Sequence, residues 1–430
     1  MNLDIEYVIS RFPAFARQLL KFSETAPGLS GARVWKVSIS SAGGALPFQV
    51  ADGVMLDLER GQSLSGESSS TEESDSPAKG RPKFQIEPRQ SGHFCLRRWP
   101  PQHPTEAQLD WIHRVLKGCT RELEVLLPLP LPTDEGATLL RHNGHLWELT
   151  PWLAGEPIAP EAISEFQLND LMLVLARFHH LAARQENKIG HSPNLLARLK
   201  QLQAVAQNLG SSRYSGSRAF PLLNAQPTPK APPTVQHTEN LTAMSKLFQQ
   251  HGATLIERLQ LSPIASRGIE QKLGLNQIAP TELKWQWPNK LMLTPIIRDL
   301  RLDHVFFQGD HVSGLIDFGA MKIDHRSFDL ARLLGSCFDI YRDLNDDGIE
   351  LAKWQHAVAI YNSMTELPPL SIPEQWLAIW ADQVAVVLGS WNWLDWLHHN
   401  RIEFANDKLV ALRVDFHRRR LDNLINAATL

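Results

Sequence analysis

The chain has 430 residues, of which 43% are hydrophobic and 21% are charged, and its formal net charge is -3. This length suffices for two domains or one large two-lobed domain, because single cores stop growing near about 250 residues. A charge this close to neutral gives no electrostatic reason to expect a nucleic-acid or membrane partner. Cys95, Cys119 and Cys337 are widely spaced and match neither a disulfide framework nor a zinc-ligand pattern.

The sequence has no recognisable targeting or membrane-spanning segment. Its N-terminus, MNLDIEYVISRF, lacks a basic stretch followed by an apolar one. No apolar run approaches the roughly 20 residues that cross a bilayer. We therefore expect a cytoplasmic protein.

Residues 1–148 are predicted to form a small lobe of strands and one helix. Val34, Val37 and Ile39 in ARVWKVSIS indicate a first strand, and HFCLRRWP indicates another that ends at its prolines. Apolar residues recur at helical spacing in 105–117. Residues 61–90 include GESSSTEESDSPAKGRP, which has no apolar periodicity and is predicted to be a flexible insertion.

Residues 149–430 are predicted to form a larger, mainly helical lobe. HLWELTPWLAGEP, at 145–157, is predicted to leave the first lobe as a strand and hinge. Helical patterns follow at 168–183, at 241–259 and from 372 to the C-terminus. The proline-rich segment 210–239 is predicted to be a second flexible insertion.

The segment 297–319, IIRDLRLDHVFFQGDHVSGLIDFG, concentrates acidic residues around a predicted hairpin. Two short apolar strands flank the turn Gln308-Gly309-Asp310. Asp299 precedes the first strand and Asp317 follows the second, so folding the hairpin brings both carboxylates to the same end. Phosphoryl transfer needs one carboxylate to orient the attacking hydroxyl and another to hold a metal ion between phosphates. Asp299 fits the first role and Asp317 the second.

This segment resembles the H-G-D-x-x-x-x-N and I-D-F-G patterns of the aminoglycoside phosphotransferase and choline kinase family, and the H-R-D and D-F-G pair of protein kinases. The resemblance implies an α+β, bilobal protein-kinase-like fold, with an antiparallel sheet in the smaller lobe. It also implies ATP or GTP as co-substrate and Mg2+ or Mn2+ as cofactor.

Three positions of this motif depart from the family pattern. His304 stands where the family has its second metal ligand, an asparagine, and imidazole suits manganese or zinc better than magnesium. A loop histidine without a ligand role is the alternative. Ile297 replaces the usual histidine, while Arg298 matches the protein-kinase arginine and is assigned to the catalytic residues.

The resemblance also implies nucleotide-binding residues in the first lobe. A glycine-containing turn in PGLSGARVWKV is similar to the family's phosphate-covering turn, with candidates Gly28, Ser30 and Gly31. Arg97 takes the place of the family's phosphate-binding lysine, with Arg98 as the alternative. Its predicted helical partner is Glu106, or Asp110 one turn later.

Two further residues are predicted to support the site. Asp329 in SFDLARLLG is similar to the family's D-L-A aspartate, which starts a helix and supports the catalytic loop, and its oxygen is expected to cap the helix amides. His179 lies on a helix similar to the family's L-A-x-x-H helix, where the histidine packs near the catalytic loop.

Two functional hypotheses follow. The first is a small-molecule kinase in which Asp299 aligns the acceptor hydroxyl, Asp317 and His304 bind the metal, and Arg97 contacts phosphate. The second is a pseudokinase, a nucleotide-binding or interaction scaffold in which the changes at His304 and Arg97 reflect the loss of phosphate transfer. Aminoglycoside, choline, homoserine and sugar-like acceptors remain open, because substrate walls in this fold follow no transferable code.

Overall fold

The computed structural model describes residues 3–15, 20–25, 31–39, 49–50, 54–55, 92–101, 103–123, 127–210, 235–261, 290–342, 348–400, 402, 404 and 406–429. The predicted insertion at 61–90 lies outside these residues, as do Gly28 and Ser30. Of the predicted insertion at 210–239, residues 210 and 235–239 are described, and all of them are helical.

The chain forms two compact units, which we call the sheet unit and the helical unit. The sheet unit comprises Met1–Thr25, Val34–Arg98 and Pro130–Trp152. The helical unit comprises Ala26–Arg33, Trp99–Leu129 and Leu153–Leu430.

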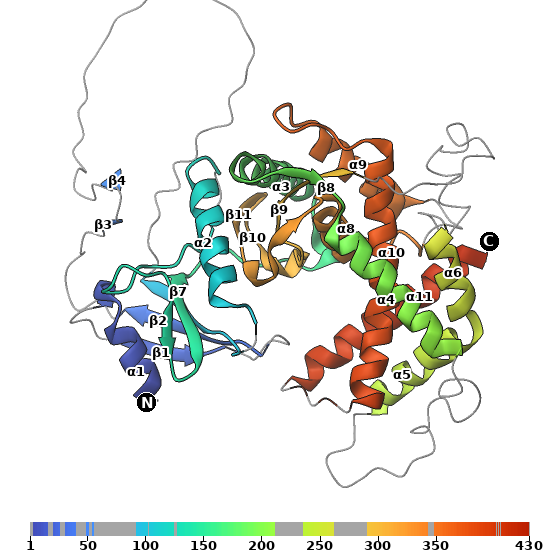
Figure 1. Ribbon diagram of the computed structural model, residues 1–430, viewed down its shortest axis with the longest axis horizontal. Helices are drawn as coiled ribbons and strands as arrows, with labels where there is room; N and C mark the ends of the chain where they lie inside the picture. Colours follow the sequence, from blue (N-terminus) through green and yellow to red (C-terminus); the bar gives the residue numbers. More distant parts are fainter. Residues whose placement is uncertain are drawn as a thin grey trace, which may run out of the picture. The chain divides into compact units, whose positions relative to one another are not determined.

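The sheet unit contains a five-stranded sheet in the order β1-β2-β5-β7-β6 (Figure 1). Its strands are β1 (Leu20–Glu24), β2 (Arg33–Ile39), β5 (His93–Arg98), β6 (Leu140–His142) and β7 (His145–Pro151). The unit also has α1 (Leu3–Ser10), the 3-10 turn η1 (Pro13–Phe15) and the short pair β3 (Gln49–Val50) and β4 (Val54–Met55). β1 pairs antiparallel with β2, and β7 pairs antiparallel with both β5 and β6.

The core of the sheet unit lies on one face of this sheet. Val37, Leu96 and Leu149 have no exposed surface, because alternate residues of a strand point to the same face. Trp35 stacks on Trp147 with ring centroids 5.6 Å apart. The strands predicted in ARVWKVSIS and HFCLRRWP are therefore confirmed as β2 and β5.

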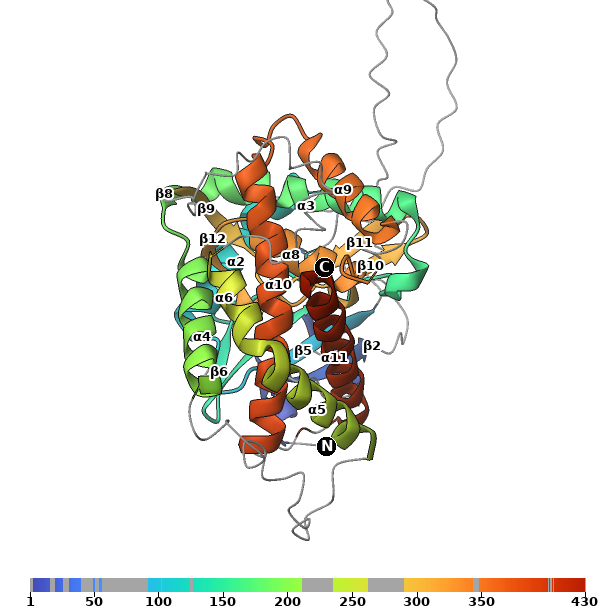
Figure 2. The ribbon, with the colours of Figure 1, turned by 90° about the vertical axis from the view of Figure 1, so that its right-hand side faces the viewer.

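The helical unit is built mainly from helices that pack on one another. They are α2 (Glu106–Thr120), α3 (Glu165–Gln185), α4 (Pro193–Gly210), α5 (Val235–Leu247), α6 (Ala253–Leu261), α8 (Ser327–Cys337), α9 (Ile349–Asn362), α10 (Ile372–Leu394) and α11 (Asp407–Thr429). Shorter helical turns are η2 (Pro160–Ala162), η4 (Phe248–Gly252), η6 (Leu302–His304), η7 (Phe318–Ala320) and η8 (Asp395–His399). Figure 2 shows α10 beside α11 and α5.

Two small β-structures lie among these helices. The antiparallel sheet β12-β9-β8 consists of β8 (Lys188–Gly190), β9 (Leu291–Ile296) and β12 (Lys322–Asp324). The hairpin consists of β10 (Val305–Gln308) and β11 (His311–Leu315) and confirms the two strands predicted around Gln308-Gly309-Asp310.

Gly155 holds the chain segment after β7 against this hairpin. Its φ is +93°, and an added Cβ would lie 2.5 Å from the carbonyl oxygen of Phe307 and from Oγ of Ser313. The amides of Glu156 and Phe307 each donate to the other residue's carbonyl oxygen, at 3.2 and 3.0 Å. A larger residue at position 155 would therefore disturb the hairpin.

The helix predicted at 105–117 exists as α2 but groups with the helical unit, whereas the sequence placed it in the first lobe. The reason is its contacts: α2 packs on α3, and Nε2 of Gln108 donates to the carbonyl oxygens of Gly319 and Met321 at 3.3 and 3.4 Å. None of the helices in the described ranges is long and apolar enough to cross a membrane.

Candidate active site

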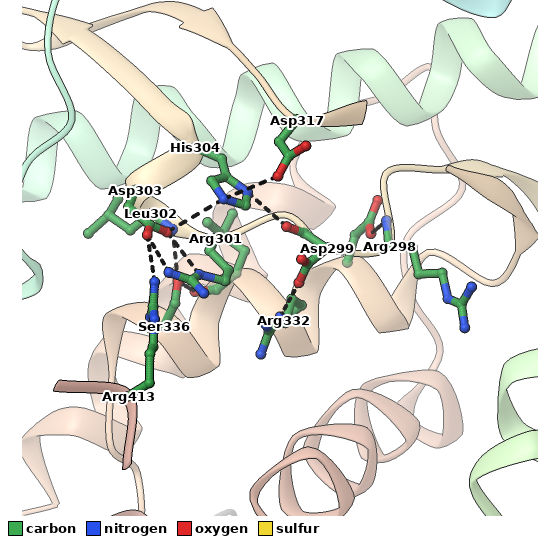
Figure 3. Close-up of polar contacts among 12 residues, drawn as sticks. Arg298, Asp299, Arg301, Leu302, Asp303, His304, Asp317, Arg332, Ser336 and Arg413 are labelled. Atoms are coloured by element: carbon green, nitrogen blue, oxygen red, sulfur yellow. Dashed lines mark hydrogen bonds and ion pairs between the residues drawn. The ribbon is translucent and has the colours of Figure 1, made fainter. Parts of the chain in front are cut away.

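The predicted residues Asp299 and Asp317 both lie against one histidine, His304, Asp299 through its main-chain carbonyl oxygen and Asp317 through its carboxylate. Asp299 follows β9 in the loop 297–304, which we call the Asp299 loop, and Asp317 follows β11. The amide of Ile316 donates to the carbonyl oxygen of His304 at 3.0 Å, which extends the β10–β11 pairing to the open end of the hairpin. His304 is thereby held between Asp299 and Asp317 (Figure 3).

The hydrogen bonds of His304 define the state of its ring. Nδ1 lies 2.9 Å from the carbonyl oxygen of Asp299, and because a carbonyl only accepts, Nδ1 carries a proton. Nε2 lies 3.7 Å from Oδ2 of Asp317, which is too long for a hydrogen bond. In the neutral ring Nε2 therefore has a lone pair beside the carboxylate, the arrangement typical of a metal-binding histidine.

Asp299 is held in its ionised form. Nε of Arg332 on α8 lies 2.7 Å from Oδ1 of Asp299. Burial alone would raise the pKa of Asp299, but the charge and hydrogen bond of Arg332 hold this pKa below its usual value. The Asp299 side chain is 44% exposed.

Asp317 has an unusual backbone conformation. Its φ and ψ are 67° and 55°, in the left-handed region that costs an L-residue free energy and that aspartate tolerates better than most. This conformation turns the chain from β11 into η7 and leaves the carboxylate side chain 40% exposed. Strain of this kind is typical of functional sites, where the surrounding structure maintains it.

Asp329 anchors the start of the Asp299 loop. Its carboxylate accepts hydrogen bonds from the amides of Ile297 and Arg298, at 2.7 and 2.5 Å. It also accepts from Nε2 of His179 at 3.1 Å. Asp329 thus supports the loop, as the resemblance predicted. The expected capping of its own helix differs, because the N-cap residue of α8 is Arg326 and the oxygens of Asp329 accept from residues 297 and 298.

His179 confirms the predicted packing of that histidine near the loop. Burial lowers the pKa of His179, so the ring is neutral and donates to Asp329 through Nε2. Nδ1 then accepts from the hydroxyl of Tyr361 at 2.7 Å. These buried hydrogen bonds run from Tyr361 on α9 through His179 on α3 to Asp329 on α8, and they hold the Asp299 loop in place.

Arg298 contributes its backbone rather than its guanidinium to this arrangement. Its φ is +72°, which the bond to Asp329 maintains. Its side chain points away from Asp299 (Figure 3). It lines a cavity of about 500 Å³ together with Trp111, Asn194 and Lys322.

Residues 79–239 and 245–367 match the sequence profile of the phosphotransferase enzyme family. The match spans more than half of the chain. The chain belongs to this family. The family resemblance inferred from the 297–319 motif is therefore confirmed.

Relatives of this phosphotransferase-family chain include two homoserine kinases. One, from Methylocella silvestris, is 33% identical over 176 residues, which are 40% of this chain and 43% of that one. Another, from a Bradyrhizobium species, is 34% identical over 139 residues, 31% of this chain and 41% of that one. The chain thus spans less than half the length of these relatives.

A choline kinase structure from Cryptosporidium parvum has the same fold. Its TM-score is 0.51 at 11% identity, and the match covers 99% of this chain and 96% of that chain. The predicted α+β, protein-kinase-like fold is therefore confirmed for this phosphotransferase-family member.

The residues around Asp317 fit a divalent cation. Two ligands of one Mg2+ ion, each about 2.1 Å from it, can lie at most about 4 Å apart. The 3.7 Å between Nε2 of His304 and Oδ2 of Asp317 satisfies this limit. Within the described ranges no three histidine, cysteine, aspartate or glutamate residues form a metal-binding group, so phosphates and water would supply the other ligands.

The predicted nucleotide residues are only partly described. Gly31 has a φ of +75° and open space around its Cα, as a glycine turn requires. Nε of Arg97 lies 3.9 Å from Oε1 of Glu148, its cross-strand neighbour on β7. The predicted pair of Arg97 with Glu106 joins the two units, so it stays a prediction. Glu106 is exposed at the first position of α2, and Asp110 is exposed one turn later.

Sequence reasoning missed the arginines around the Asp299 loop. Nε of Arg301 lies 2.8 Å from Oδ1 of Asp303, and Nη2 of Arg413 on α11 lies 2.8 Å from Oδ2 of the same residue. The sequence could have indicated that Arg332 lies near this loop, because Arg332 follows Asp329 by three residues and so lies on the same helix face. Nothing in the sequence indicated the contact between Arg413 and Asp303, because this contact depends on how α11 packs.

Proposed function

We propose that this protein transfers the γ-phosphate of ATP or GTP to a hydroxyl of a small molecule. The observation that carries the proposal is the placement of Asp299 and Asp317 on either side of His304, with Asp299 kept ionised by Arg332. The family match and the relatives named homoserine kinase support it.

Asp299 positions the acceptor in this proposal. Its free carboxylate oxygen accepts a hydrogen bond from the acceptor hydroxyl and takes up the proton as transfer proceeds. The hydroxyl oxygen forms a bond to the γ-phosphorus, and the bond from that phosphorus to the bridging oxygen of the nucleotide breaks. The products are a phosphate monoester and a nucleoside diphosphate, which carries away the electron pair of the broken bond.

Asp317 and His304 hold a divalent cation, Mg2+ or Mn2+, in the same proposal. When bound, the cation neutralises charge on the phosphate oxygens. Gly28, Ser30, Gly31 and Arg97 keep their sequence-based assignment as phosphate-contacting residues, which stays a prediction.

Homoserine is the acceptor that the relatives' names suggest. It belongs to the group of small hydroxyl compounds that the motif alone leaves open, together with aminoglycosides, choline and sugar-like alcohols. We therefore propose L-homoserine as the first acceptor to assay.

Phosphate transfer from radiolabelled ATP and GTP to L-homoserine, with Mg2+ and with Mn2+, tests this proposal directly. We expect metal-dependent formation of the phosphate ester and its loss in Asp299→Asn. Asp310→Asn, at the tip of the hairpin, is the matched control and should stay active.

The alternative function is a pseudokinase, favoured by the histidine at position 304 in place of the family's asparagine. Such a scaffold binds nucleotide without transferring phosphate. Calorimetric titration of the same protein with nucleotide separates the two: tight binding without transfer to any acceptor alcohol would support the scaffold and reject the kinase.

A further inference from the structure

A cavity near Asp299 is lined by four arginine side chains. We call it the arginine cavity and define it by Arg301, Arg332, Arg413 and Arg420; its volume is about 220 Å³. Arg332 forms its boundary with the candidate active site, because the same guanidinium contacts Asp299. A molecule in this cavity would thus lie one side chain away from the proposed catalytic carboxylate.

The positive charge of this cavity is concentrated at Arg301 and Arg413. Arg332 pairs with Asp299, and Arg420 lies between Asp382 and Asp339. Asp382 pairs with Arg420 at 2.8 Å, while Asp303 is shared between Arg301 and Arg413. One carboxylate between two guanidinium groups leaves a positive charge there.

Buried nitrogen atoms of the cavity wall also lack hydrogen-bond partners. Within the part of the chain that the structure describes, this holds for Nε of Arg413, Nε of Arg420 and Nδ1 of His417. Buried polar atoms without partners are costly, and a ligand that accepts their hydrogen bonds removes this cost. An anion in the cavity can accept hydrogen bonds from the two guanidinium groups.

The same arginines act on His417, a buried ring in the cavity wall. Burial, followed by the charges of Arg332, Arg420 and Arg301, lowers the pKa of His417 to about 3. The ring is therefore neutral at physiological pH. A cationic acceptor group, such as the trimethylammonium of choline or the amines of an aminoglycoside, would meet the same repulsion.

We infer that the arginine cavity binds a carboxylate group of the acceptor and thereby brings its hydroxyl to Asp299. Arg332 and Arg413 are the specificity-determining residues, because one contacts Asp299 and the other carries an unpartnered buried Nε. The inference rests on the proposed kinase function and narrows it to hydroxy acids. A larger cavity of about 930 Å³ shares the wall residues Ser336 and Arg420 with it.

The test compares acceptors that differ only in this charge. The full chain is assayed with metal and ATP on L-homoserine and on L-homoserine amide, and on choline and kanamycin. We expect kcat/KM for the acid to exceed that for the amide by about tenfold or more, because the amide leaves the guanidinium groups without their anion. L-2-aminobutyrate, which has no hydroxyl, should compete with homoserine more strongly than its amide does.

The variant Arg413→Gln should reduce the preference for acid over amide to about threefold or less, mainly through KM. Arg413→Lys should retain part of it. Arg419→Gln, on the same helix with a side chain that is 60% exposed, is the matched control and should keep the wild-type preference. The wild-type comparison and the aminobutyrate competition remain decisive if Arg413→Gln does not fold.

Two results would overturn the inference: equal use of acid and amide by the wild type, or equal losses on both acceptors in Arg413→Gln. Preferred transfer to choline or kanamycin would do the same and would leave the kinase function standing. Absence of transfer to every acceptor would instead reject the proposed function itself.

Discussion

Nε of Arg332 lies 2.7 Å from Oδ1 of Asp299, and the two residues are 33 positions apart in the chain. The guanidinium outweighs the effect of burial and keeps the pKa of Asp299 below its usual value. Asp299 therefore remains ionised, and able to accept a proton, as the pH falls through the mildly acidic range.

We predict that Arg332→Gln moves the acidic limb of the kcat/KM profile to higher pH. Without the cation, burial dominates and raises the pKa of Asp299, so protonation inactivates the enzyme earlier as pH falls. Arg332→Lys keeps the charge and should keep the limb near its wild-type position. A limb that does not move in Arg332→Gln would show that Asp299 is not the titrating group.

The contacts of Asp329 predict a coupled loss of stability and activity. Asp329→Asn replaces one accepting oxygen by an amide nitrogen, which leaves a buried backbone N–H of the Asp299 loop without a partner. We expect a loss of about 1–3 kcal/mol in the free energy of unfolding, the usual cost of such a group. Arg298 then loses its support at positive φ, and kcat should fall by about tenfold or more.

Urea unfolding and steady-state kinetics measure these two effects of Asp329→Asn. Asp415→Asn, which removes a surface carboxylate on α11 that contacts Arg418 and Arg419, is the control. It should change the free energy of unfolding by less than about 1 kcal/mol. An Asp329→Asn protein with wild-type stability and kcat would contradict the anchoring role.

How much of this site could be predicted depended on the distance in sequence between contacting residues. The β10–β11 hairpin and the place of Asp317 followed from local alternation and a glycine turn. The contact of His304 with Asp299 spans five residues. Asp303 and Arg413 are 110 positions apart, and their contact depends on the packing of α11, which periodicity within a helix does not determine.

The same limit explains the position of α2. Its helical pattern predicted residues 105–117, close to the observed Glu106–Thr120. Its grouping with the helical unit depends on Gln108 and on contacts with α3, which are tertiary. Local sequence patterns thus predicted the helices and strands, whereas only the structure shows which of them pack together.

Glu374 at the start of α10 predicts an acid-sensitive contribution to stability. Its carboxylate accepts from Nε2 of His325 at 2.9 Å and from the amide and hydroxyl of Ser371, both at 2.8 Å. Burial would raise the pKa of Glu374, but His325 and Ser371 together lower it to about 2. Because the folded pKa is depressed, this stabilisation is present above pH 4.5 and is lost as pH falls toward 2.

We expect the free energy of unfolding of the wild type to fall by roughly 2–3 kcal/mol more than that of Glu374→Gln between pH 5 and pH 2. Glu374→Gln should already be the less stable protein at pH 7. Urea unfolding followed by tryptophan fluorescence at a series of pH values measures both. Parallel curves for the two proteins would argue against the depressed pKa.

Substitution of Asp299 and substitution of Asp317 should impair the enzyme in different ways. Asp299→Asn keeps the side-chain shape, so nucleotide and metal should still bind while transfer falls by about 100-fold or more. Asp317→Asn removes an anionic ligand, so metal-dependent nucleotide affinity should fall together with turnover, and added acceptor should not restore it. Calorimetric titration with and without metal distinguishes them. Equal nucleotide affinity in wild type and Asp317→Asn would reject the metal-ligand role.

The last prediction concerns the metal preference set by His304. Nδ1 of His304 is committed to the carbonyl oxygen of Asp299, so Nε2 is the atom available to a cation beside Asp317. Imidazole nitrogen favours manganese over magnesium, whereas an amide oxygen favours magnesium. His304→Asn should therefore raise nucleotide affinity with Mg2+ relative to Mn2+ by several-fold.

His311→Asn is the matched control for this change, because His311 lies at the other end of the hairpin with a side chain that is 63% exposed. Its ratio of nucleotide affinities with Mg2+ and Mn2+ should equal that of the wild type. The measurement is calorimetric titration with each metal, which needs no acceptor and so is independent of turnover. A ratio that stays unchanged in His304→Asn would remove His304 from the metal site and leave it the role of holding the Asp299 loop through its Nδ1 hydrogen bond.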